Sequence, residues 1–286
     1  MSIIVTGATG QLGRLIVESL LRRGADPAEI TATGRAVEKL EDLSAQGVAT
    51  ARFDFDAPDS AVLSAGDTLM LVSGSEVGQR SRQHAAVIDA ARDAGMDRII
   101  YTSLLRADRS ALALGPEHRD TEQALADSGV PYTLLRNGWY VENYRGSFDQ
   151  AAATGSFSGS AGDGRVSPAT RADYAEAAAA VLLSQGHEGQ TYELAGSQDT
   201  TMAGFARLFA EALGRDVEYK NLDPAAHEQA LRDAGLDDGT IEFVVTLDAH
   251  VAAGELYSDS TDLEQLIGRP TTPLAEVVQE WAADQS

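Results

Sequence analysis

Short apolar runs alternate with amphipathic stretches along the first half of the chain. Apolar runs predict strands at residues 3–6, 29–33, 48–54, 68–72, 98–102 and 132–135. Between them, apolar residues at helical spacing predict helices at 11–23, 37–46, 80–94 and 117–127. Strands this apolar are expected where helices cover both faces of a parallel sheet. The alternation therefore predicts βαβ units in a doubly wound sheet.

The pattern changes from about residue 137. Residues 154–167 are rich in Gly and Ser, and Asp163-Gly164 is a dipeptide that favours a tight turn, so we expect an ordered β-hairpin there rather than a linker. Thr170 and Asp173 form a weak capping-box match that opens an Ala-rich helix through Leu183. A strand at 191–195 and a mostly helical remainder follow.

These elements predict an α/β fold, a Rossmann-type doubly wound parallel sheet with a smaller, mostly helical C-terminal lobe. We expect residues 1–136 to form the sheet domain and 137–286 the smaller lobe, with parts that return to the main sheet. A chain of 286 residues is long enough to bury a substantial core in such an arrangement.

Composition excludes several classes of function. The 22 basic and 44 acidic residues give a net charge of −22, which nucleic acids and anionic membrane surfaces would repel. The sequence has no cysteine, and its five histidines never occur at metal-ligand spacing, so we expect neither a disulfide nor a metal site. The chain begins directly with a strand and shows no export or membrane segment, so we expect a cytoplasmic protein.

A glycine-rich turn links the first strand to the first helix. Its G-x-x-G-x-x-G spacing lets the backbone approach a diphosphate, which the N–H groups of the helix N-terminus can bind. The alternative is a tight turn without a ligand. The residues expected to bind the dinucleotide here are Gly7, Thr9, Gly10, Gln11, Leu12 and Gly13.

The end of the second strand distinguishes between the two nicotinamide dinucleotides. An NAD site usually has an acid there, whereas NADP needs a cation for the 2′-phosphate. Here Gly34-Arg35 follows the strand and the first acid is Glu38. Arg35 can bind a phosphate in a forked geometry, Gly34 would leave room for it, and Lys39 could add charge. We therefore expect NADPH, although Arg35 could instead be a solvated side chain that begins a helix.

The sequence lacks the usual acid for ketone reduction. The Tyr-x-x-x-Lys pair of short-chain dehydrogenases is absent, because the residues four before Lys39 and Lys220 are Arg35 and Asp216. A reduced quinone is a phenolate-like anion with a pKa of about 10, so a quinone can be reduced without a positioned acid. The five histidines are expected to be structural or at the surface, but His118 is a stronger catalytic candidate than the other four, because it opens the helix that normally carries the Tyr.

Further candidates follow the fourth and sixth strands, since an open α/β sheet binds ligands at its carboxyl edge. The small residues Ser73, Gly74 and Ser75 would let the ribose and nicotinamide lie against the backbone. Asn137 and Asn143 offer amides, and Tyr140 or Asn143 could orient a quinone oxygen. Trp139, Tyr140 and Tyr144 offer flat faces suited to an aromatic acceptor. The alternative, equally expected, is that these rings pack between the two lobes and hold them together.

With these residues in view, the chain resembles the NmrA-like branch of the atypical short-chain dehydrogenases. Within that branch it is most similar to the bacterial NAD(P)H:quinone oxidoreductases of type 2, and more distantly to the triphenylmethane reductases. The resemblance extends almost from end to end. It rests on VTGATGQLG at 5–13, SEVGQR at 75–80, YTSLLRAD at 101–108, TLLRNGWYVENY at 133–144, AGDG at 161–164, ATRADYA at 169–175 and LIGRPTTPLAE at 266–276.

The resemblance implies an NADPH-dependent reductase that transfers two electrons to a quinone without flavin, that is, an NAD(P)H dehydrogenase (quinone). It implies an NADP-binding domain at 1–136 and a substrate-binding lobe at 137–286. It adds cofactor contacts from Gly138, Trp139 and Arg171. Two alternatives stay open: a non-enzymatic NADP(H) redox sensor, and a reductase of triarylmethane or azo dyes.

Overall fold

The computed structural model describes residues 2–285, which form two compact units. The first, called the sheet unit, contains residues 2–137, 171–194 and 265–268. The second, called the helical unit, contains residues 138–170, 195–264 and 269–285. Every helix in the described chain is too short or too polar to span a bilayer.

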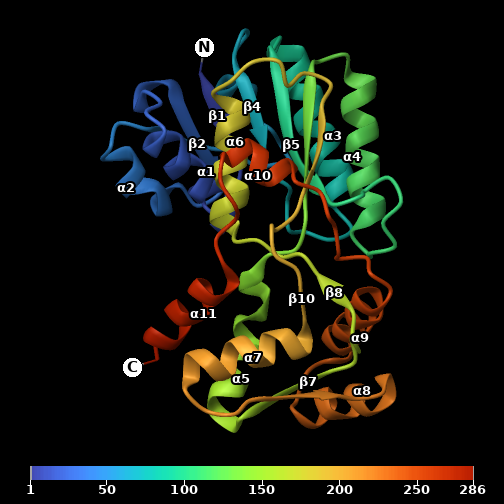
Figure 1. The fold of residues 1–286 in the computed structure, drawn as a ribbon. Helices are drawn as coiled ribbons and strands as arrows, with labels where there is room; N and C mark the ends of the chain where they lie inside the picture. The colour runs from blue at the N-terminus through green and yellow to red at the C-terminus, as the bar shows by residue number, and fades with distance from the viewer. Residues whose placement is uncertain (1, 286) are drawn as a thin grey trace. The chain divides into compact units, whose positions relative to one another are not determined.

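The sheet unit is built on a seven-stranded, all-parallel sheet with the strand order β3-β2-β1-β4-β5-β6-β9 (Figure 1). This is the predicted Rossmann-like α/β fold. The order reverses between β1 and β4, and such a switch point opens a ligand crevice at the carboxyl ends of the strands. The strands are β1 (Ile3–Val5), β2 (Ile30–Gly34), β3 (Ala49–Arg52), β4 (Thr68–Leu71), β5 (Arg98–Leu104), β6 (Tyr132–Asn137) and β9 (Thr191–Leu194).

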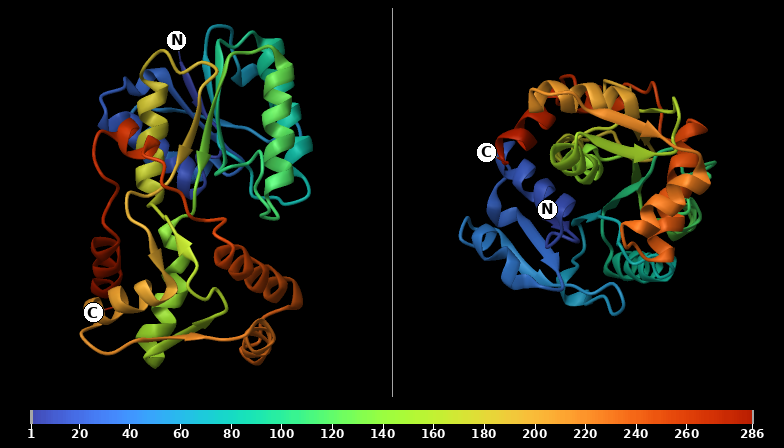
Figure 2. Two further views of the ribbon diagram at one scale, coloured as in Figure 1. Left: turned by 45° about the vertical axis from the view of Figure 1, so that its right-hand side comes forward. Right: turned by 90° about the horizontal axis from the view of Figure 1, so that it is seen from below.

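Pairs of helices cover the two faces of this sheet (Figure 2). On one face α1 (Gln11–Arg22) packs against α6 (Arg171–Leu182), whose small alanines allow a close approach. On the other face α3 (Arg80–Ala94) packs against α4 (Gly115–Ser128). The predicted helix at 37–46 is instead a 3-10 turn, Val37–Leu40, followed by the short α2 (Glu41–Ser44).

The helical unit is organised around an aromatic core. The rings of Phe148, Phe209 and Trp281 pack together, with Phe148 lying 5.3 Å from Phe209 and 5.7 Å from Trp281 between centroids. Its helices are α5 (Arg145–Thr154), α7 (Met202–Leu213), α8 (Pro224–Asp233), α9 (Asp238–Ala252) and α11 (Leu274–Ala283), and α10 (Asp262–Ile267) passes into the sheet unit. The mostly helical C-terminal part is thus as expected from the sequence.

The predicted hairpin at 154–167 is wrong. The segment is ordered, but β7 (Ser156–Gly159) pairs in parallel with β11 (Glu218–Asn221), and β8 (Arg165–Val166) pairs with β10 (Thr200–Thr201). A tight turn does form at Asp163-Gly164, where the N–H of Gly164 donates to the Ala161 carbonyl at 3.0 Å, but the strands on its two sides pair with distant segments. Gly164 also permits a close approach, because a Cβ there would lie 2.4 Å from the carbonyl oxygen of Val251 in α9.

Candidate functional site

The glycine turn after β1 exposes backbone N–H groups at the start of α1. Gly7 has a φ of +64°, and the turn is closed by the N–H of Gly10, which donates to the Gly7 carbonyl at 2.9 Å. Gly10 is the N-cap of α1 and makes no side-chain capping bond. The N–H groups of the first turn of α1 are therefore available to an anion, as a diphosphate site requires.

Two glycines are required by contacts within this turn. A Cβ at Gly13 would lie 2.4 Å from the Gly7 carbonyl oxygen, so α1 can approach the turn only with glycine there. A Cβ at Gly34 would lie 2.6 Å from the side chain of Thr9. The sequence predicts room for a phosphate beside Gly34, but the structure fills this space with the side chain of Thr9. The turn itself presents glycine backbone and fits a diphosphate.

Arg35 extends from the end of β2, with 61% of its side chain exposed. Its Nη1 lies 2.6 Å from Glu76 Oε1, an acid contributed by the segment after β4. Lys39 is also exposed, in the 3-10 turn that follows. In the sequence, the first acid after this strand end is Glu38. Glu76 could not be recognised there as a neighbour of Arg35, because these two residues meet only in the fold.

The Ser73–Ser75 segment after β4 is fixed by three side chains, one from β5 and two from α3. Ser73 N–H donates to Thr102 Oγ1 at 2.8 Å. The Gly74 peptide is held on both sides: its N–H donates to His84 Nε2 at 3.0 Å, and its carbonyl accepts from Arg80 Nε at 2.9 Å. A loop fixed in this way is preorganised to place its backbone against a ligand.

Glu117, at the start of α4, anchors the next part of this loop. Its carboxylate accepts from the backbone N–H of Gly78 at 2.8 Å and of Arg80 at 3.2 Å, and it pairs with the Arg80 guanidinium at 2.7 Å. The pair is nearly buried, with 5% of the Arg80 side chain and 14% of the Glu117 side chain exposed. No local sequence signal pointed to this contact, which joins α4 to the loop after β4.

Both histidines near this loop are buried and neutral. Because His84 Nε2 accepts from Gly74, its Nδ1 carries the proton and faces Thr121 Oγ1 at 3.0 Å. Burial, with a smaller effect of Arg80, lowers the pKa of His84 to about 3. Burial likewise lowers the pKa of His118 to about 3, helped by Arg80 and His84. His118 Nδ1 lies 2.7 Å from the hydroxyl of Tyr101, and this buried contact favours a structural role for the histidine.

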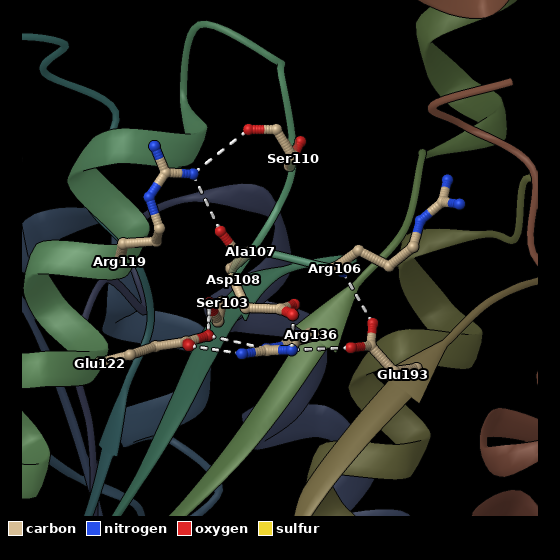
Figure 3. Close-up of polar contacts among 9 residues, drawn as sticks. All are labelled: Ser103, Arg106, Ala107, Asp108, Ser110, Arg119, Glu122, Arg136 and Glu193. Atoms are coloured by element: carbon tan, nitrogen blue, oxygen red, sulfur yellow. Dashed lines mark hydrogen bonds and ion pairs between the residues drawn. The ribbon is translucent and has the colours of Figure 1, made fainter. Parts of the chain in front are cut away.

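A cluster around Arg136 fixes the carboxyl ends of β5, β6 and β9 (Figure 3). Arg136 binds both carboxylate oxygens of Glu122, at 3.0 and 2.7 Å, and also contacts Glu193 and Asp108, each at 2.8 Å. Burial opposes its charge, but the hydrogen bonds to Glu122 and Glu193 outweigh burial and raise the pKa of Arg136. Ser103 donates to Glu122 at 2.5 Å and so belongs to this cluster.

The same cluster positions the loop after β5. Arg106, with a φ of +52°, is the one residue other than glycine with a positive φ among the described residues, and its N–H donates to Glu193 at 2.7 Å. Arg119 of α4 donates to the carbonyls of Ala107 at 3.0 Å and Ser110 at 3.2 Å. A left-handed backbone at a non-glycine residue persists only where its surroundings fix it, as they do here.

Asn137 ends β6 with a buried side chain whose Oδ1 has no hydrogen-bond partner among residues 2–285. Its backbone carbonyl accepts from Leu105 N–H at 2.9 Å. A buried amide oxygen without a partner is rare and costly, so the position suits a ligand that donates a hydrogen bond. The carboxamide of a nicotinamide is such a donor.

The segment after Asn137 belongs to the helical unit and is held by backbone bonds. Ala169 N–H donates to the Trp139 carbonyl at 3.1 Å, and Val141 N–H donates to the Ala169 carbonyl at 3.0 Å. A 3-10 turn, Val141–Tyr144, follows, and the side chain of its Asn143 is exposed. Tyr144 stacks on Phe205 at 4.3 Å, so this ring contributes to the core of the helical unit.

The predicted site residues thus fall into two groups. In the sheet unit, the candidates lie at the carboxyl edge of the sheet: the glycine turn, Arg35 and Ser73–Ser75 follow the neighbouring strands β1, β2 and β4, and Asn137 ends β6, which β5 separates from β4. Arg171, also in the sheet unit, is the first residue of α6. In the helical unit lie Gly138, Trp139, Tyr140 and Asn143.

Known proteins are similar to this chain in sequence and in fold. The model of a family described as NAD(P)H-binding matches residues 7–185. Quinone oxidoreductase 2 of Escherichia coli is 47% identical over 278 residues, covering 96% of this chain and 97% of that protein.

Solved structures agree. The crystal structure of the E. coli NADPH-dependent quinone oxidoreductase complexed with NADPH has a TM-score of 0.90 at 48% identity, covering 97% of this chain and 99% of that one. Triphenylmethane reductase of Citrobacter sp., complexed with NADP(H), has a TM-score of 0.92 at 34% identity, covering 98% of this chain and all of that one (100%). The chain belongs to the NAD(P)H-binding family, and over nearly its whole length it is similar to quinone oxidoreductase 2 of E. coli.

Proposed function

We propose that this protein is an NADPH-dependent quinone oxidoreductase that transfers a hydride directly to its acceptor without flavin. The observation that carries the proposal is the similarity, over 97% of this chain, to an E. coli protein described as an NADPH-dependent quinone oxidoreductase. The absence of a Tyr-x-x-x-Lys pair from the sequence supports the same acceptor class, because a quinone needs no positioned acid.

The sheet unit offers groups for each part of the cofactor. The N–H groups after Gly10, including those of Gln11 and Leu12, would bind the diphosphate. Arg35, with Lys39 nearby in sequence, would bind the 2′-phosphate. The fixed Ser73–Ser75 backbone would hold the nicotinamide end, together with Asn137 Oδ1, which has no hydrogen-bond partner within residues 2–285. When bound, the reduced nicotinamide supplies the hydride.

The helical unit would supply the acceptor contacts. In this proposal Asn143 and Tyr140 orient the quinone oxygen, and Trp139 offers a flat apolar face. The reduced quinone is a phenolate-like anion whose pKa is about 10, so water can protonate it. His118 would then support the site through Tyr101 rather than donate a proton, since burial holds the imidazole in its neutral form.

A panel of acceptors tests the proposal. NADPH consumption, followed by its absorbance, should be fast with benzoquinones or naphthoquinones in a flavin-free preparation, with one NADPH used per quinone reduced. A protein that binds NADPH but consumes none with any quinone would contradict the proposal.

A second candidate function changes only the acceptor. The Citrobacter triphenylmethane reductase has a TM-score of 0.92, which favours including a triarylmethane dye in the panel, together with an azo dye. Faster turnover of such a dye than of every quinone would favour a dye reductase. Binding of NADP⁺ and NADPH with different affinities, but without turnover of any acceptor, would favour a redox sensor.

A further inference from the structure

We propose that Glu76 is a second cofactor-selecting residue, which binds the adenosine ribose hydroxyls of NADH at the same place where Arg35 binds the 2′-phosphate of NADPH. The Arg35–Glu76 pair would then let one site accept both dinucleotides. The inference rests on the proposed dinucleotide site, but not on the identity of the acceptor.

The pair is close and yet open to solvent. Arg35 Nη1 lies 2.6 Å from Glu76 Oε1, while 61% of the Arg35 side chain and 40% of the Glu76 side chain are exposed. An exposed ion pair contributes little free energy and is readily exchanged for another partner. A dianionic phosphate can therefore recruit Arg35, whereas a ribose hydroxyl can donate to the carboxylate.

Glu76 is held in place independently of Arg35. Its Oε2 accepts from Gln83 Nε2 at 3.0 Å, and the same amide contacts Asp56 at 3.2 Å. Gln83 lies on α3 and is only 3% exposed, so it is a fixed donor. Because a carboxylate has about four acceptor positions, Glu76 keeps free positions for two hydroxyls while Gln83 holds it.

The position of Glu76 is that of the acid in an NAD site, although it comes from another strand. NAD-binding folds usually place Asp or Glu at the end of the second strand, where it accepts from the ribose hydroxyls. Here β2 ends at Gly34, and Arg35 follows. Since β2 and β4 both flank β1, the segment after β4 can bring Glu76 to the same strand end, as its contact with Arg35 demonstrates.

Binding constants of matched ligands test this inference. Dissociation constants of NADPH, NADH, 2′,5′-ADP and 5′-AMP would be measured by calorimetry at one ionic strength for the wild type and for Glu76→Gln. We expect a dissociation constant for NADH about three- to tenfold higher in the variant, with that of NADPH unchanged or lower, because a charged acceptor is lost beside Arg35. 5′-AMP should follow NADH, and 2′,5′-ADP should follow NADPH.

Two further variants keep the outcome unambiguous. Glu38→Gln removes the same charge from the neighbouring 3-10 turn, whereas the acid that pairs with Arg35 is Glu76, so this variant should leave the ratio of the NADH and NADPH dissociation constants as in the wild type. Arg35→Ala should weaken NADPH but leave NADH bound as tightly or more tightly. An equal loss of both dinucleotides in Glu76→Gln, or an unchanged NADH constant, would overturn the inference, and so would a loss of NADH in Arg35→Ala.

The inference and the proposed function can fail separately. Glu76-dependent binding of NADH in a protein that reduces no quinone would remove the function and leave the inference standing. Quinone turnover with NADPH, together with an NADH dissociation constant that Glu76→Gln does not change, would support the proposed function and overturn the inference.

Discussion

His84 Nε2 accepts a hydrogen bond from the backbone N–H of Gly74 at 3.0 Å. The contact requires a neutral imidazole, because a protonated Nε2 would face another donor. The loop that follows β4 is therefore coupled to the charge state of a buried side chain in α3. That coupling has a consequence for stability as a function of pH.

The free energy of unfolding should fall as the pH falls below about 6.5. His84 and His118 have a pKa of about 3 in the folded protein against 6.5 as the ordinary value, so the unfolded chain binds the protons first. Each histidine then contributes a slope approaching about 1.4 kcal/mol per pH unit between these values. Urea unfolding between pH 7.5 and 4 measures the slope. In His84→Gln, the slope of the free energy of unfolding against pH should be smaller than in the wild type. An unchanged slope would contradict the buried, neutral state of His84.

Glu117→Gln should destabilise the protein and raise the KM for NADPH. The substitution leaves Arg80 as a buried guanidinium without its carboxylate, and breaking such a pair typically costs about 3 kcal/mol or more. It also weakens the anchor of the loop that carries Gly74. Asp120→Asn on the same helix removes an exposed carboxylate that accepts from Ser81, and this control should leave both quantities near wild type. Equal effects of the two substitutions would show that Glu117 does not position the loop.

Gly13→Ala should weaken dinucleotide binding strongly. A Cβ there would lie 2.4 Å from the Gly7 carbonyl, so α1 must move away from the turn whose N–H groups bind the diphosphate. NADPH titration and thermal unfolding measure the two effects. Gly146→Ala in α5 is the matched control, since a Cβ there meets nothing within 4 Å. The control should be neutral or stabilise by about 0.5–1 kcal/mol.

Arg136→Met should be among the most destabilising single substitutions in the sheet unit. It removes the guanidinium that binds both carboxylate oxygens of Glu122, a residue with 11% of its side chain exposed. Removing one partner from a buried pair costs about 3–5 kcal/mol. Arg92→Ala removes an arginine of α3 that pairs with the exposed carboxylates of Asp89 and Asp93, and its midpoint of urea unfolding should stay close to that of the wild type. Similar midpoints for the two variants would refute the role of the Arg136 cluster.

Local signals predicted much of the sheet unit. The helix at 80–94 and its C-cap Gly95, with a φ of +72°, are found where the sequence placed them, because helix periodicity and a terminal glycine are both read within one segment. The glycine turn and the end of β2 were likewise evident from neighbouring residues.

Contacts between distant segments were not predictable in the same way. Glu76 meets Arg35, and Glu117 meets Arg80, across separations of 41 and 37 residues, so neither contact leaves a local pattern. The failed hairpin has the same cause, since the partners of β7 and β8 lie far along the chain. Asn137 was selected from its place after a strand, and only the fold revealed that its amide oxygen is buried without a partner among the described residues.

The packing of α6 against α1 limits how this protein can be divided. Because α6 and the edge strand β9 come from residues 171–194, a fragment that stops at Asn137 would lack both and leave the covered face of α1 in water. Such a fragment should aggregate rather than fold. The sheet unit therefore cannot be moved into another protein as one continuous segment of the gene, because part of it is encoded after the first segment of the helical unit.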